Sequence, residues 1–155
     1  FLVRALDRIP SLAGVKYTHE DLADFAACVA FADGRYDVLF GRDELLLEGW
    51  DRKAVGAVGS TYNYAAPLYL QILAPLQAGN RVKARLLQDQ AIRMIAVCNG
   101  VGVTHLAASK AIMADLGVDC GPTRAPVRSI NSAQLAELRR QLKAIGFLGL
   151  ACKAA

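Results

Sequence analysis

The first part of the chain alternates short apolar runs with amphipathic segments. The apolar runs cover residues 13–17, 36–40 and 56–59, and each is followed by a tight polar or glycine-rich loop. Between the first two runs, apolar residues over 22–29 recur at i, i+3, i+4 and i+7, which is the spacing of one helical face. This alternation predicts parallel strands flanked by helices.

Helical periodicity takes over from about residue 64. Helices are expected over 80–100, 104–116 and 131–145. Asn80 and Asn131 stand where side-chain N-caps belong, and a glutamine three residues after Asn131 completes a capping box. The second part of the chain is therefore predicted to contain helices only.

Three parallel strands do not make a finished domain. Such a sheet has two open edges and needs cover on both faces. A complete eight-stranded (β/α) barrel takes about 250 residues, whereas this chain has 155 and no initiator methionine. We therefore expect the C-terminal part of an α/β barrel, followed by extra helices.

Composition narrows the class of protein without indicating its chemistry. Apolar residues make up 54 % of the chain and the net charge is +4, with no basic stripe of the kind that binds nucleic acid. The richest apolar stretch, 64–78, is interrupted by prolines and is too short to span a bilayer. No metal-ligand spacing occurs, and the irregularly spaced cysteines are expected to be buried thiols in a reducing cytoplasm. They are Cys28, Cys98, Cys120 and Cys152.

Lys16 is the most informative residue of the first predicted strand. Side chains alternate along a strand, so Gly14, Lys16 and Thr18 share one face. An ammonium group near the end of a buried strand is costly unless it is paired or its pKa falls, and a neutral amine attacks carbonyls to form a Schiff base. The alternatives are structural: Lys16 reaches water from the strand end, and Thr18 with Asp21 has the spacing of a capping box.

Polar groups also follow the other two predicted strands. Asp43 and Glu44 come after the second, where two carboxylates can bind a polyol or simply cap and begin a helix. Gly59 and Ser60 come after the third, where a glycine allows close approach of a ligand and a serine offers a hydroxyl. A glycine-rich turn with a helix cap explains this pair equally well.

Taken in order, these motifs resemble those of the N-acetylneuraminate lyase family, within the pyruvate-dependent class I aldolases that include dihydrodipicolinate synthase. The lysine motif is shared by the wider group, whereas the second and third resemble the sialic acid lyases specifically. The likeness runs over nearly the whole chain. Its motifs are Gly14-Val15-Lys16-Tyr17-Thr18, Gly41-Arg42-Asp43-Glu44 and Gly59-Ser60-Thr61-Tyr62-Asn63.

The resemblance implies a (β/α)8 TIM barrel, with about strands six to eight in residues 1–79 and a C-terminal helical extension in 80–155. It implies that Lys16 forms an imine in a lyase that cleaves N-acetylneuraminate to pyruvate and N-acetylmannosamine. It further implies a cytoplasmic homotetramer without metal or organic cofactor, and without a nucleic-acid or membrane partner. The substrate-binding residues that it implies are Thr18, Gly41, Asp43, Glu44, Gly59 and Ser60.

Two groups of that family have no counterpart in this chain. They are the tyrosine on strand five that moves a proton and the hydroxyl pocket after strand two that binds the pyruvate carboxylate. Tyr17 and Tyr62 do not match that tyrosine, and Arg42 stands at a variable position of its motif and is expected to decide little. The chain is thus expected to be a C-terminal half, incomplete for catalysis. The alternatives are another 2-keto acid aldolase or dehydratase, such as a dihydrodipicolinate synthase-like enzyme, and a non-catalytic barrel that serves as scaffold or ligand sensor.

Overall fold

The computed structural model describes residues 1–152, and its contacts divide the chain into two compact units. The first unit runs from Phe1 to Gly59 and contains all the strands in the described residues. The second begins at Ser60 and is helical. The boundary expected after residue 79 separates a barrel from its helical extension in the whole protein. The division by contacts within this chain does not test it, so it stays a prediction.

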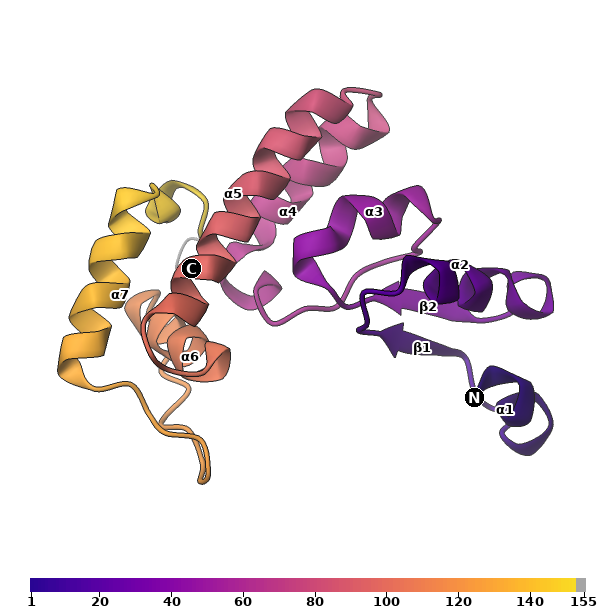
Figure 1. Cartoon of the computed structure of the whole chain (residues 1–155), viewed down its shortest axis with the longest axis horizontal. Coiled ribbons are helices and arrows are strands. Elements are labelled where there is room, and N and C mark those ends of the chain that lie inside the picture. Colours follow the sequence, from indigo (N-terminus) through magenta and orange to yellow (C-terminus); the bar gives the residue numbers. More distant parts are fainter. Residues whose placement is uncertain (153–155) are drawn as a thin grey trace. The chain divides into compact units, whose positions relative to one another are not determined.

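The first unit is built on two parallel strands, β1 and β2, which lie side by side (Figure 1). Their register pairs Gly14 with Asp37 and Tyr17 with Phe40, so the strands end together. The elements in chain order are α1 (Leu2–Arg8), β1 (Gly14–Tyr17), α2 (Leu22–Ala30), η1 (Phe31–Gly34), β2 (Asp37–Phe40), η2 (Asp43–Leu45) and α3 (Leu46–Asp51).

The third predicted strand is reduced to a single bridge. Ala57 pairs in parallel with Phe40, whose N–H donates to Gly56 O at 2.9 Å and whose carbonyl accepts from Val58 N at 2.9 Å. The segment therefore runs along the edge of β2 as predicted but is not a regular strand. Gly56 and Ala57 have little side chain to pack, and the described residues give the segment a neighbour on one side only.

Helix α2 covers this small sheet and begins differently from the prediction. Its N-cap is Asp21, whose carboxylate accepts from the N–H groups of Ala23 and Asp24, each at 3.0 Å. The predicted capping box that starts at Thr18 is wrong, because Asp21 is better placed to satisfy the first free N–H groups of the helix. Thr18 is thus left out of the helix end.

The core of the first unit lies between α2 and the sheet. Phe25 of α2 stacks edge-on against Phe40 of β2 at 4.9 Å between ring centroids, and Val38 packs in the same buried cluster. This cluster fixes α2 over β2 and so supports the two loops that leave the ends of β1 and β2.

The second unit begins with α4 and α5, which run antiparallel to each other (Figure 1). The predicted caps are confirmed: Asn80 accepts from Lys83 N at 3.0 Å, and Asn131 and Gln134 form a complete capping box. The segment of residues 119–130 is irregular. The elements are α4 (Tyr62–Gln77), α5 (Arg81–Gly100), α6 (His105–Asp115), α7 (Ser132–Ala144) and η3 (Phe147–Gly149).

Two further expectations concern the thiols and the membrane. All four cysteines are free, but the prediction that all are buried is correct for Cys98 alone. Cys28 and Cys152 are half-buried, and Cys120 is exposed because it lies in the irregular segment after α6. Within residues 1–152 no single helix is long and apolar enough to cross a bilayer. The pair α5 and α6 passes that length and composition test only when joined, and it is bent by 108°.

The buried cluster predicts a large difference between two valines of the first unit. Val38 is 1 % exposed and Val55 is 60 % exposed. Val38→Ala removes two buried methylene equivalents and leaves a cavity, so we expect the free energy of unfolding to fall by about 2 kcal/mol. Val55→Ala is the matched control and should change it by less than about 0.5 kcal/mol. Urea denaturation measures both, and equal losses would contradict the assignment of the core.

Candidate active site

The carboxyl ends of β1 and β2 bring together residues that lie far apart in the sequence. The strands end at Tyr17 and Phe40, and the ladder continues one step further because Gly41 N donates to Tyr17 O at 2.8 Å. Thr18 and Gly41, the first residues after the strands, are thereby held next to each other.

Gly41 lies against two of the predicted site residues. A Cβ atom at position 41 would overlap Thr18 Oγ1 and would lie only 2.9 Å from Lys16 Cε. The glycine is thus required by space, since only a hydrogen fits between its Cα and these two side chains. The structure therefore confirms that Lys16 and Thr18 share a face, and it adds Gly41 to them.

The Lys16 side chain is exposed in this structure, which differs from the expectation of a buried strand. The reason is local: β2 flanks β1 on one side, and the described residues place no strand on the other. Lys16 also lines a cleft of about 540 Å³ beside α1 and α2, together with Val15 and Cys28. Its amine can be reached by a small carbonyl compound.

Asp43 and Gly59 form a second close approach at the same end of the sheet. Asp43 is 6 % exposed and is the first residue of η2, whose N-cap is Arg42, so Asp43 is not the N-cap that the structural alternative required. A Cβ atom at Gly59 would overlap the Asp43 carboxylate. The backbone that follows the bridge to β2 therefore packs directly on this carboxylate.

Glu44 is next to Asp43 but is half-buried and takes part in an ion-pair cluster. Arg42 Nε lies 3.8 Å from Glu44 Oε2, and Arg42 Nη2 lies 3.8 Å from Glu20 Oε2. Glu20 and Arg42 were not predicted as site residues. The sequence signal for them is weak: Arg42 comes two residues after the end of β2, and Glu20 comes three residues after the end of β1.

Ser60, the remaining predicted residue, begins the second compact unit and is described with it. Its carbonyl oxygen accepts from Asn63 N at 3.4 Å and from Asn63 Nδ2 at 3.0 Å, which shapes the turn before α4. The Ser60 side chain is exposed. Its substrate-binding role stays a prediction.

Tyr17 lies on the other face of β1, toward α2. Its hydroxyl donates to Asp21 O at 2.7 Å and to Asp24 Oδ2 at 3.0 Å. Burial, together with the hydrogen bond to the Asp24 carboxylate that favours the neutral phenol, raises the pKa of Tyr17 to about 12. A phenol held in this way is poorly suited to proton transfer. This agrees with the expectation that Tyr17 is not the tyrosine that moves a proton.

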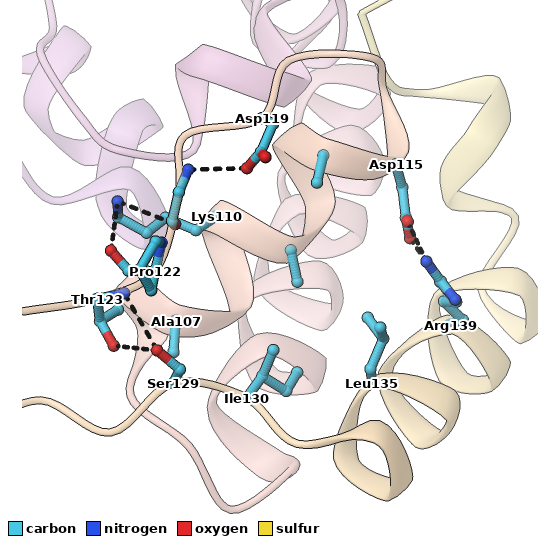
Figure 2. Close-up of a pocket in the computed structure, with 13 residues that line it drawn as sticks. Ala107, Lys110, Asp115, Asp119, Pro122, Thr123, Ser129, Ile130, Leu135 and Arg139 are labelled. Atoms are coloured by element: carbon cyan, nitrogen blue, oxygen red, sulfur yellow. Dashed lines mark hydrogen bonds and ion pairs between the residues drawn. The ribbon is translucent and has the colours of Figure 1, made fainter.

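A second hollow lies entirely within the helical unit, between α6, the irregular segment and α7 (Figure 2). Its volume is about 260 Å³, but its charged groups are engaged with the protein itself. Lys110 Nζ donates to the carbonyl oxygens of Cys120, Gly121 and Pro122 at 2.6, 3.3 and 3.2 Å, and Arg139 Nε donates to Asp115 at 2.9 Å. The bonds from Lys110 hold the irregular segment against α6, and the Arg139–Asp115 pair joins α7 to α6, so we assign this hollow a structural role.

The chemistry of the first-unit site follows from its residue types. A primary amine can attack a ketone, a neighbouring hydroxyl can hydrogen-bond the resulting adduct, and carboxylates can accept hydrogen bonds from a polyol. Residues 1–152 contain no group of three or more histidines, cysteines or acids arranged to hold a metal ion. The expected absence of a metal cofactor stays a prediction.

Comparison with curated proteins finds relatives along most of this chain. Among curated proteins, the chain is 37 % identical over 121 residues to the N-acetylneuraminate lyase of Danio rerio and 36 % identical over 146 residues to that of Mus musculus. These alignments cover 77 % and 92 % of this chain, but 39 % and 45 % of the relatives.

Solved structures give the same result. The Proteus mirabilis N-acetylneuraminate lyase superposes with a TM-score of 0.89 at 37 % identity, covering 95 % of this chain and 49 % of that chain. The sialic acid aldolase of Aliivibrio salmonicida gives 0.88 at 33 % identity, covering 95 % and 48 %. The chain therefore spans about half the length of the relatives that it matches.

The family match extends well beyond the lysine motif. Residues 2–145 match the Dihydrodipicolinate synthetase family, and this range includes every residue of the candidate site. On this match the chain belongs to the Dihydrodipicolinate synthetase family, whose members fold as TIM barrels.

Proposed function

We propose that the protein carrying this chain is a Schiff-base lyase that cleaves N-acetylneuraminate to pyruvate and N-acetylmannosamine. The observation that carries the proposal is the packing of Lys16 and Thr18 against Gly41 at the carboxyl ends of two parallel strands. TIM-barrel enzymes have their active sites at this end of the strands. Relatives and structural neighbours named N-acetylneuraminate lyase support the choice of substrate.

In the proposed reaction, the neutral amine of Lys16 attacks the C2 ketone of the open-chain sugar acid. The carbinolamine loses water to give an iminium ion, which accepts the electron pair of the C3–C4 bond as that bond breaks. The C4 hydroxyl loses its proton to a base and becomes the aldehyde of N-acetylmannosamine. The remaining enamine is protonated at C3, and hydrolysis of the imine releases pyruvate and restores Lys16.

The other residues of the site are assigned to binding. Thr18 and Lys16 both approach Gly41, and we assign the Thr18 hydroxyl to a hydrogen bond with the imine-linked substrate. Asp43 and Glu44 are acceptors for the hydroxyl groups of the sugar tail. Gly41, Gly59 and Ser60 are assigned to the same tail, with the glycines allowing close approach to the backbone.

The proposal extends to the rest of the barrel. Residues 14–17, 37–40 and 56–59 are assigned to strands six, seven and eight of a (β/α)8 barrel. The tyrosine that moves a proton and the pocket for the pyruvate carboxylate are then assigned to another part of the full-length protein. That part corresponds to the half of the relatives that this chain does not span. We also assign to the whole protein a homotetrameric state, a cytoplasmic location and a mechanism without metal or organic cofactor.

The first prediction concerns the nucleophile. Treating the full-length protein with pyruvate and borohydride should add one reduced pyruvyl group at Lys16, because borohydride traps the imine as a secondary amine. Lys16→Arg should abolish the addition, since a guanidinium does not form the imine. Lys53→Arg, a change at an exposed lysine of the same unit, should leave it intact. An unmodified Lys16 peptide by mass spectrometry would favour the non-catalytic alternative.

The second prediction separates sugar cleavage from the chemistry shared by all 2-keto acid aldolases. Glu44→Gln removes a charged acceptor, so we expect KM for N-acetylneuraminate to rise about tenfold to a hundredfold. Pyruvate trapping at Lys16 should continue, because the imine does not involve the sugar tail. Glu137→Gln, on an exposed ion pair of α7, is the control. Equal loss of cleavage and trapping would argue against a sugar-binding role and favour another 2-keto acid substrate.

The third prediction concerns space at Gly41. Gly41→Ala forces a methyl group into Thr18 Oγ1 and toward Lys16 Cε, which displaces the nucleophile. We expect kcat/KM to fall by about a hundredfold, the cost of misplacing a reacting group by about 1 Å. Gly100→Ala has open space around the added Cβ and should retain activity. Steady-state kinetics checks both variants, and full activity in Gly41→Ala would refute the close approach.

A further inference from the structure

The Arg42 guanidinium lies between two carboxylates that come from different loops. Its Nε is 3.8 Å from Glu44 Oε2 and its Nη2 is 3.8 Å from Glu20 Oε2. One guanidinium group therefore pairs with two carboxylates, those of Glu20 and Glu44, which are 24 positions apart in the sequence. This arrangement differs from the expectation that Arg42 decides little.

The backbone around Arg42 connects this cluster to the site. Arg42 directly follows Gly41, and its carbonyl oxygen accepts from Leu45 N at 3.0 Å, closing the turn that contains Glu44. Glu20 lies in the loop that leaves β1, two residues after Thr18. The two ion pairs therefore join the loop of Thr18 to the turn of Glu44.

The charges and exposures indicate how strong this connection is. The side chains of Arg42, Glu44 and Glu20 are 36 %, 34 % and 72 % exposed, so solvent screens both pairs. An arginine in such a cluster offsets one of the two negative charges and limits the rotamers of the half-buried Glu44. The pairs therefore affect the position of the Glu44 carboxylate only modestly. They do not affect Lys16 directly, because neither pair includes it.

We propose that Arg42 is a positioning residue for substrate binding. Held by Glu20, its guanidinium orients the Glu44 carboxylate toward the hydroxyl-rich part of the substrate and keeps the loops after β1 and β2 in register. This inference rests on the proposed function, since it assigns Glu44 to the sugar tail. It adds to that function a residue from each loop, Glu20 and Arg42, neither of which touches the substrate.

The test compares Arg42→Ala, Arg42→Lys, Glu20→Gln and the double variant Glu20→Gln/Arg42→Ala in the full-length protein. KM and kcat for N-acetylneuraminate are measured together with the rate of pyruvate trapping at Lys16. Arg8→Ala, which removes an exposed arginine from α1, is the control for loss of a positive charge. Because Glu20 is mostly exposed, its variant keeps the proposal testable even if Arg42→Ala does not fold.

We expect Arg42→Ala and Glu20→Gln each to raise KM about twofold to fivefold, the range of exposed ion pairs, with kcat and trapping unchanged. The double variant should be no worse than Arg42→Ala, because the two residues act through one cluster. Arg42→Lys should recover part of the loss. Salt at about 1 M, where the Debye length is about 3 Å, should reduce the ratio of variant to wild-type KM toward one.

Each other outcome has a definite meaning. An unchanged KM in both single variants overturns the inference while leaving the lyase proposal intact. A raised KM in Arg42→Ala with no effect of Glu20→Gln also overturns it, because Arg42 would then bind the substrate directly. If the wild-type protein neither traps pyruvate nor cleaves N-acetylneuraminate, the proposed function fails and this inference fails with it.

Discussion

The site depends on the parallel pairing of β1 and β2 in a register that ends both strands at the same level. The hydrogen bond from Gly41 N to Tyr17 O extends that pairing by one residue, and it brings Gly41 Cα against Thr18 and Lys16. A shift of one residue would turn the Lys16 side chain to the other face of the sheet, where α2 packs. The proposed chemistry therefore depends on main-chain hydrogen bonds before it depends on the side chains assigned to it.

Two glycines carry out related tasks at this end of the sheet. Gly41 leaves room for the side chains of Lys16, the proposed nucleophile, and Thr18, and Gly59 leaves room for the buried Asp43 carboxylate. In each case the missing Cβ allows a side chain from another segment to lie directly on the backbone. Glycine is needed at these two positions because a Cβ atom would not fit. The backbone angles there are ones that any residue can adopt. The glycines and polar residues that follow the strands in the sequence reflect this packing.

Helix caps and the parallel arrangement of the strands were predictable from the sequence, whereas the side-chain contacts between distant segments were not. The caps at Asn80 and Asn131 were recognised because a helix end uses neighbours three residues away. The cap of α2 was misplaced by three residues, since Thr18 and Asp21 both suit that position and only the course of the chain decides between them. The site residues came from motif resemblance, whereas the pairing of Arg42 with Glu20 depends on strand register and leaves no local signal.

The helical unit shows a different way of holding an irregular segment. Lys110 donates to three consecutive main-chain carbonyl oxygens, from Cys120 to Pro122, so one ammonium group satisfies three backbone acceptors of the turn. Recognition of backbone alone is indifferent to the residue types that it holds. Substitutions at Cys120 that preserve the chain path are therefore compatible with this anchor, and the constraint on the turn rests on a residue that lies ten positions earlier on α6. Gly121, whose φ is 66°, is constrained by its own backbone angle, whereas the bond to Cys120 does not depend on the side chain at position 120.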